Sequence, residues 1–172
     1  AYALANECDY DRHKYMELLE KYGEFLSTYA LYDEQGKIEQ ELLNLRISVF
    51  GQNHPDVAKS YNNIGNVYAF QGDYDKALGY YEKSLNISLS VLGAEHPDVA
   101  GSYNGIGYVY SSQGNYPAAL EHYTKALEIQ LAVFGERHPD VAGSYNNIGN
   151  VYSSQGNYSV ALEHYNKALG IQ

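Results

Sequence analysis

The 172-residue chain is 45% apolar, carries 20 tyrosines and has a formal net charge of −10, as expected for an ordered, water-soluble protein. No stretch approaches the roughly 18 consecutive apolar residues of a membrane-spanning helix, so no membrane association is expected. The acidic balance weighs against nucleic acid as a partner, because binding to a phosphate backbone relies on clustered Lys and Arg.

The single Cys8 excludes an internal disulfide and suits a reducing compartment. The first residues, AYALANEC, have neither the basic nor the apolar region of a signal peptide. We therefore expect a cytoplasmic protein.

The first fifty residues show apolar side chains at helical spacing on either side of a glycine. The first stripe consists of Met16, Leu19, Tyr22, Leu26 and Tyr29, and the second of Ile38, Leu42, Leu45 and Val49. If Gly36 ends the first helix, residues 1–51 form a divergent helix pair. The second helix would then be shorter than the later ones by about one and a half turns.

From residue 52 onward the sequence repeats itself. The segment HPDVA begins at His54, His96 and His138, which gives a 42-residue period. A fixed period of this size is the signature of a solenoid whose units bury their apolar faces against one another. The copies are assigned to residues 52–93, 94–135 and 136–172, the last being truncated at its C-terminal end.

Each copy has the start and stop signals of two helices. Pro55 suits the first turn of a helix, Gly72 can adopt the left-handed conformation that ends it, and Asp73 is a good N-cap for the next. So short a connection predicts an antiparallel pair and an all-α fold. Gly65 is expected where the two backbones approach closely, facing Ala77.

The repeated residues resemble the tetratricopeptide repeat in the 42-residue form of kinesin light chains. The resemblance rests on Tyr61, Ile64, Gly65, Tyr68, Gly72, Tyr74, Ala77, Tyr81 and the HPDVA linker. It implies a right-handed superhelical solenoid that acts as a protein-binding scaffold, with the first helix of each pair lining the concave groove. Kinesin light chains have basic groove residues with few counterparts here, which weighs against an acidic cargo.

A polar stripe lies beside the packing residues of each first helix. Its members, the candidate peptide-binding residues, are Lys59, Asn62, Asn66, Asn104, Tyr108, Asn146 and Asn150. An asparagine amide both donates and accepts hydrogen bonds, so it can match a peptide backbone of any sequence. Related superhelices hold peptides with groove asparagines, as the resemblance implies. Alternatively, these asparagines bond only to neighbouring helices.

No residue pattern predicts catalysis, a cofactor or a metal site. His54, His96 and His138 precede helix-start prolines and are expected to serve the turn, because no cluster with metal-ligand spacing surrounds them. We find no nucleophile beside a base and no phosphate-binding glycine loop.

We therefore predict a non-catalytic, monomeric scaffold that binds a peptide segment of a partner protein. One alternative is a self-assembling solenoid, in which chains stack through an uncapped C-terminal end. Another is the sensor or regulatory arm of a larger multidomain protein.

Overall fold

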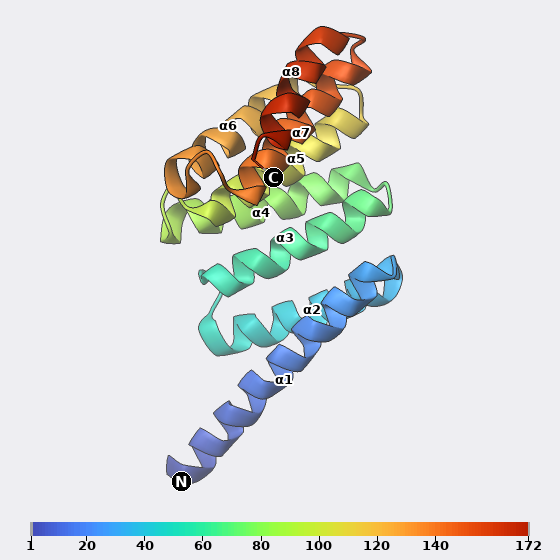
Figure 1. Ribbon diagram of the computed structural model, residues 1–172. Coiled ribbons are helices and arrows are strands. Elements are labelled where there is room, and N and C mark those ends of the chain that lie inside the picture. The colour runs from blue at the N-terminus through green and yellow to red at the C-terminus, as the bar shows by residue number, and fades with distance from the viewer. Residues whose placement is uncertain (1, 172) are drawn as a thin grey trace.

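The computed structural model describes residues 2–171, with side chains from Asp11 onward. This part of the chain contains eight α-helices and no strand. They are α1 (Tyr2–Thr28), α2 (Tyr32–Phe50), α3 (Pro55–Phe70), α4 (Tyr74–Val91), α5 (Pro97–Ser112), α6 (Tyr116–Phe134), α7 (Pro139–Ser154) and α8 (Tyr158–Leu169). Helices pair antiparallel and the pairs stack in chain order (Figure 1). The predicted all-α solenoid is confirmed.

The three repeated first helices begin at their prolines, as predicted. Before each proline, the imidazole Nδ1 of the histidine accepts the N–H of the aspartate two residues later, at 3.2 Å in all three copies. His54, His96 and His138 are therefore N-cap residues. This confirms that the histidines serve the turn.

The turns inside the repeated pairs also follow the prediction. Gly72 has φ of +80°, a left-handed conformation that favours glycine, and its two equivalents adopt the same conformation. The carboxylate of Asp73 then accepts the backbone N–H of Lys76 at 3.3 Å and caps α4. Asn115 and Asn157 cap α6 and α8 in the same way.

The predicted position of the turn in the first helix pair was wrong. Gly36 lies inside α2, where it packs against Val67, and α2 has 19 residues, the same length as α6. The turn is formed instead at Ala30, one full period before Gly72, with φ of +55°. Leu31 occupies the N-cap position and makes no side-chain cap. The first pair therefore follows the period of the others.

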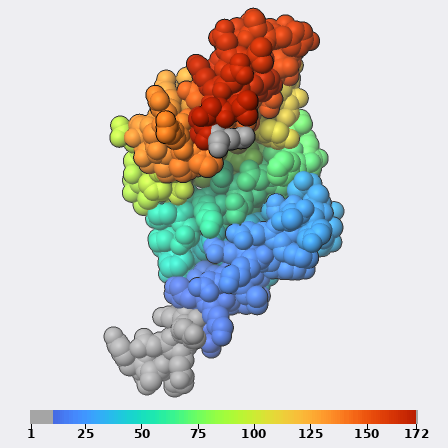
Figure 2. Space-filling model, viewed as in Figure 1, coloured from blue at the N-terminus to red at the C-terminus, as the bar shows by residue number. Residues whose placement is uncertain are grey.

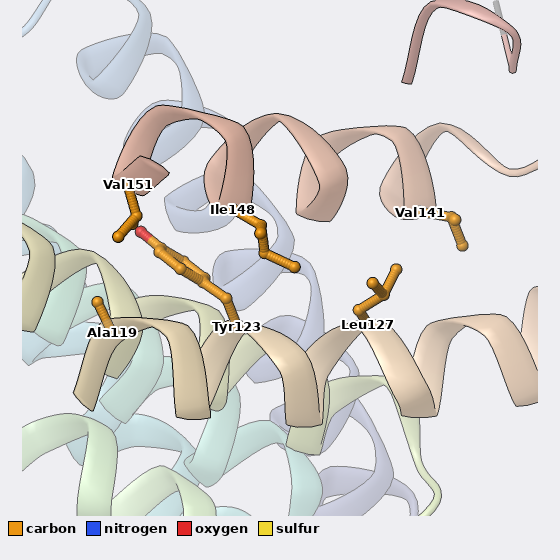
Figure 3. Close-up of a cluster of buried hydrophobic side chains, with 6 residues drawn as sticks. All are labelled: Ala119, Tyr123, Leu127, Val141, Ile148 and Val151. Atoms are coloured by element: carbon orange, nitrogen blue, oxygen red, sulfur yellow. The ribbon is translucent and has the colours of Figure 1, made fainter. Parts of the chain in front are cut away.

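The mid-helix glycines lie against tyrosine rings rather than against the predicted alanines. A Cβ on Gly107 would lie 2.8 Å from a ring carbon of Tyr123, and the pairs Gly65–Tyr81 and Gly149–Tyr165 show similar distances. Figure 3 shows Tyr123 extending from α6 toward the apolar side chains of α7, among them Ile148 and Val151. The glycines are therefore needed for a ring that joins one pair to the next.

The curvature of the stack places α3, α5 and α7 on the inner side. In the part of the chain that the structure describes, the backbone of α5 approaches those of α3 and α7 closely, whereas the backbones of α4 and α6 stay farther apart. Figure 2 shows the helix pairs following one another in chain order on the molecular surface. We call α3, α5 and α7 the inner helices, and their shared surface the inner face.

Candidate functional site

Asn62 and Asn104 lie at equivalent junctions between successive inner helices. The Nδ2 of Asn62 on α3 lies 3.8 Å from where a Cβ on Gly101 of α5 would be. The Oδ1 of Asn104 on α5 accepts a hydrogen bond from the hydroxyl of Ser144 on α7 at 3.5 Å. Both asparagines are half-buried, as is Asn146, the third in the series. The side chains therefore lie at the junctions that form the inner face.

Two further asparagines are held by buried or half-buried tyrosines. The hydroxyl of Tyr81 donates to Oδ1 of Asn66, and that of Tyr165 donates to Oδ1 of Asn150, both at 2.7 Å. The bond uses the amide oxygen and fixes the orientation of the amide. The Nδ2 groups have no partner among the described residues. In Asn66 and Asn150, bonding to a neighbouring helix therefore uses only the amide oxygen, Oδ1. We call Asn62, Asn66, Asn104, Asn146 and Asn150 the amide ladder.

Lys59 belongs to a cluster of charges at one end of the inner face. Its Nζ lies 3.6 Å from Oε1 of Glu20, which also pairs with the buried Arg46. Arg46 in turn donates to the hydroxyl of Ser60 at 2.6 Å. Lys59, Glu20, Arg46, Glu17 and Asp56 line a cavity of about 330 Å³. The positive charge of Lys59 is thus offset by carboxylates.

The equivalent hollow two repeats later is formed mainly by uncharged side chains. It has a volume of about 330 Å³ and includes Asn104, Gln130, Ser144 and Asn147 in its lining. The hydroxyl of Ser144 donates to Oε1 of Gln130 at 2.6 Å, so Gln130 stands where the first hollow has Arg46. The inner face therefore changes from charged near α1 to amide-rich near α7.

A row of three aromatic rings runs from the start of α2 across α3 to α5, near the C-terminal ends of these two inner helices. Tyr108 on α5 is 40% exposed, and its ring centroid lies 6.0 Å from that of Phe70 on α3. Phe70, which is 52% exposed, stacks in turn on Tyr32 of α2 at 5.1 Å. We call Tyr32, Phe70 and Tyr108 the aromatic row. Tyr108 was a predicted site residue, but Phe70 was missed.

The sequence did contain a signal for Phe70. The equivalent residues in the next two repeats are Ser112 and Ser154, so Phe70 breaks the repeat with a large apolar side chain. The predicted stripe of this repeat stopped at Asn66, although Phe70 lies one helical turn beyond it.

Beneath the charged end of the face, Glu39 replaces the tyrosine of the other layers. It stands one period before Tyr81, and its Oε1 accepts a hydrogen bond from Nδ2 of Asn63 at 3.0 Å. Burial raises the pKa of Glu39, while the bond from Asn63 and the charge of Arg46 act in the opposite direction. Its Oε2 is buried and has no partner among the described residues.

Two negative findings apply to the described chain. Its side chains form no group of three or more His, Cys, Asp or Glu that could bind a metal ion. None of its helices combines the length and the apolar character needed to cross a lipid bilayer.

Comparison with known proteins identifies the repeat. The family model of the tetratricopeptide repeat matches residues 37–90, 56–132 and 98–172. Among solved structures, BtubC (BKLC) from P. vanneervenii superposes with a TM-score of 0.76 at 22% identity, covering 91% of this chain and 62% of its own. A P. anserina protein described as a kinesin light chain with nearly identical TPR-like repeats superposes with a TM-score of 0.75 at 18% identity. The match covers 91% of this chain and 74% of that protein.

At 22% and 18% identity, these structural similarities establish only the fold. The chain spans 62% of the length of BtubC. No protein of curated function matches the sequence. At the level of the fold, the predicted likeness to the repeats of kinesin light chains is confirmed. Because the family model covers most of the sequence, this chain belongs to the tetratricopeptide repeat family.

Proposed function

We propose that the inner face binds an extended segment of a partner protein, without catalysing a reaction on it. Tetratricopeptide repeats usually serve as protein-interaction scaffolds, and the single cysteine suits a role in the cytoplasm. The observation that carries the proposal is the shared arrangement of Asn66 and Asn150. In both, a tyrosine hydroxyl holds the amide oxygen while Nδ2 stays without a partner in the described structure.

Such an amide can donate to a backbone carbonyl of a ligand without reading its sequence. Neighbouring helices lie about 8–10 Å apart, so the ladder repeats at a spacing that an extended chain covers in about three residues. The rungs would then distribute hydrogen bonds along the ligand. Side-chain preference would come from the non-repeated residues of the same face.

The experiment is a selection of displayed random dodecapeptides on the wild-type chain, followed by titration of the best binder. Replacing Asn104 and Asn146 with alanine should weaken binding while thermal stability is unchanged. Ser144 keeps its bond to Gln130 when Asn104 is removed. If the double variant binds the selected peptide as the wild type does, the inner face is not the binding site.

A second candidate function, self-association, is favoured by the exposed face of α8. Tyr158 and Leu162 are 71% and 59% exposed, whereas their equivalents Tyr116 and Leu120 pack against the cluster that joins α6 to α7. A second copy stacked end to end would cover this face. Sedimentation velocity should then show association that increases with concentration and is abolished by Leu162→Lys; a monomer throughout would exclude this candidate.

A further inference from the structure

The aromatic row stands where the repeat otherwise has polar side chains. Phe70 replaces the serine of the next two repeats, and Tyr108 replaces the asparagine found at Asn66 and Asn150. Both rings remain about half exposed. Exposed aromatic side chains gathered on a binding face commonly mark a contact with a ligand.

The rings of the row are held by one another. Tyr32 and Phe70 are stacked, with an angle of 23° between their planes, and Phe70 meets Tyr108 edge to face at 60°. They come from three helices, α2, α3 and α5. The row is therefore formed before any ligand arrives, which lowers the entropy lost on binding.

A carboxylate is fixed at the same junction of α2 and α3 as the stacked rings of Tyr32 and Phe70. Asp33 follows Tyr32 in the chain, and its Oδ1 accepts a hydrogen bond from Nε2 of Gln71 at 2.7 Å. Gln71 follows Phe70, so the bond joins α2 to the end of α3 next to the stacked rings. Both Asp33 and Gln71 are exposed, which leaves the carboxylate within reach of a ligand in solvent.

The charges around this end of the row are mainly negative. Asp73 and Asp75 line a neighbouring hollow of about 480 Å³, and Lys76 is tied to Asp73 at 2.6 Å. Asp33 also lines a cavity of about 740 Å³ whose cation, Lys37, is accompanied by Glu41. A positive ligand group is thus favoured over a negative one.

We propose that the aromatic row and Asp33 form a subsite for an arginine side chain of the bound segment. This inference rests on the proposed peptide-binding function and names the preferred side chain. A guanidinium is planar and cationic, so it stacks on an aromatic ring and at the same time donates a fork of N–H groups to a carboxylate. Lysine offers neither the plane nor the fork, and an acidic segment would be repelled.

The test compares peptides selected on two forms of the full chain. The library is the displayed random dodecapeptide set, and the variant is Phe70→Ser with Tyr108→Asn. Both substitutions introduce the residues that other repeats carry at these positions, so the variant should fold, as its melting temperature will verify. Arginine should be enriched on the wild type and not on the variant. The best arginine peptide should bind the variant roughly 3- to 30-fold more weakly.

Two further variants test the contribution of the Asp33 charge and whether the rings act in the same way at another position of the array. Asp33→Asn should reduce the preference for arginine over norleucine in the selected peptide while the rings remain. Adding Ser112→Phe and Asn150→Tyr to the first variant should restore arginine enrichment one repeat further along. There, Tyr74, Asp75 and Gln113 already occupy the positions equivalent to Tyr32, Asp33 and Gln71.

Enrichment of aromatic or proline side chains in place of arginine would overturn the inference, as would equal arginine enrichment on the wild type and on the Phe70→Ser, Tyr108→Asn variant. Failure of the proposed function looks different. In that case no peptide is enriched on the wild type, or Asn104→Ala with Asn146→Ala leaves all selected peptides bound. If the Phe70→Ser, Tyr108→Asn variant loses only the arginine peptides and still binds other selected peptides, the subsite is supported.

Discussion

The ring of Tyr81 lies so close to Gly65 that a Cβ on the glycine would be 2.7 Å from ring atom Cε1. On its other side the same ring faces Gly105 of the next inner helix, where a Cβ would clash with the same ring atom. Tyr81 is 1% exposed. One buried ring thus joins an inner helix to its own partner and to the following repeat, and this explains glycines in mid-helix, each unfavourable by about 1 kcal/mol relative to alanine.

This packing predicts that Gly107→Ala destabilises the chain by about 1–3 kcal/mol. The new methyl group would lie 2.8 Å from a ring carbon of Tyr123, which is 3% exposed and enclosed by α6 and α7. Chemical denaturation monitored by circular dichroism measures the change.

Gly79 on α4 provides the matched control for this substitution. A Cβ at that position meets nothing within 4 Å, so Gly79→Ala should be neutral or stabilise by up to about 1 kcal/mol. An equal loss of stability in both variants would refute the role assigned to the ring.

Glu39→Gln should raise the melting temperature at pH 7 by roughly a few degrees. The amide keeps an oxygen for the bond from Asn63 and removes a charge that burial disfavours. Glu39 is 4% exposed, and burial is the main cause of its raised pKa. Thermal unfolding at several pH values provides the measurement.

The pH dependence follows from the direction of that shift. Because the folded pKa of Glu39 lies above the ordinary value of 4.5, the unfolded chain releases the proton first as pH rises, and the folded state loses stability across that interval. The advantage of Glu39→Gln should therefore be full at neutral pH and vanish as pH falls toward 4.5. An advantage that is constant with pH would contradict this explanation.

The first turn can be improved by restoring the residues of the repeat. Ala30 has a left-handed backbone with φ of +55°, and Leu31 caps α2 without a side-chain bond. Ala30→Gly with Leu31→Asp reproduces the Gly72–Asp73 pair and should stabilise the chain by about 2 kcal/mol. Denaturant titration tests this, and each single variant should give about half the gain. A loss of stability would show that the first turn differs from the others.

His122 should make the chain less stable in mild acid. Its ring stacks on Tyr110 with centroids 5.5 Å apart, and its pKa is lowered by burial first and then by the charge of Lys125. Since the unfolded histidine titrates near 6.5, stability is complete above that pH and falls as pH decreases toward the lower folded pKa.

The matched variant is His122→Tyr, because Tyr80 stands at the equivalent position and stacks on Tyr68 in the same manner. Unfolding free energies measured from pH 8 to 5 should decrease less in the variant than in the wild type. Parallel curves would show that His122 does not titrate as described.

Much of the fold was predictable because the period repeats the chemistry of helix ends. Pro55, Gly72 and Asp73 each have equivalents, so three copies of one signal located the start of every helix and the turn inside each pair from residue 55 onward. The first pair was misinterpreted because Ala30 replaces the turn glycine and Gly36 offers a false one. Counting back one period from Gly72 would have located the turn at Ala30, whereas a search for turn-forming residue types could not have done so.

The site was harder to predict, because repeated residues and binding residues look alike in a single sequence. The asparagines were identified from their spacing, yet nothing in that spacing indicated that Tyr81 would bind Asn66 or that Glu20 would offset Lys59. These contacts depend on how one helix pair is rotated against the next. Phe70 was within reach of sequence reasoning, as a departure from the repeat rather than as a member of it.

The most direct test of peptide binding at the inner face is calorimetric titration of one selected peptide into three forms of the chain. These are the wild type, Asn104→Ala with Asn146→Ala, and a control, Asn86→Ala with Asn166→Ala, which removes exposed amides from the outer helices α4 and α8. Loss of two backbone hydrogen bonds should weaken binding roughly tenfold or more, with the control unchanged. Equal affinity in all three forms would contradict the account.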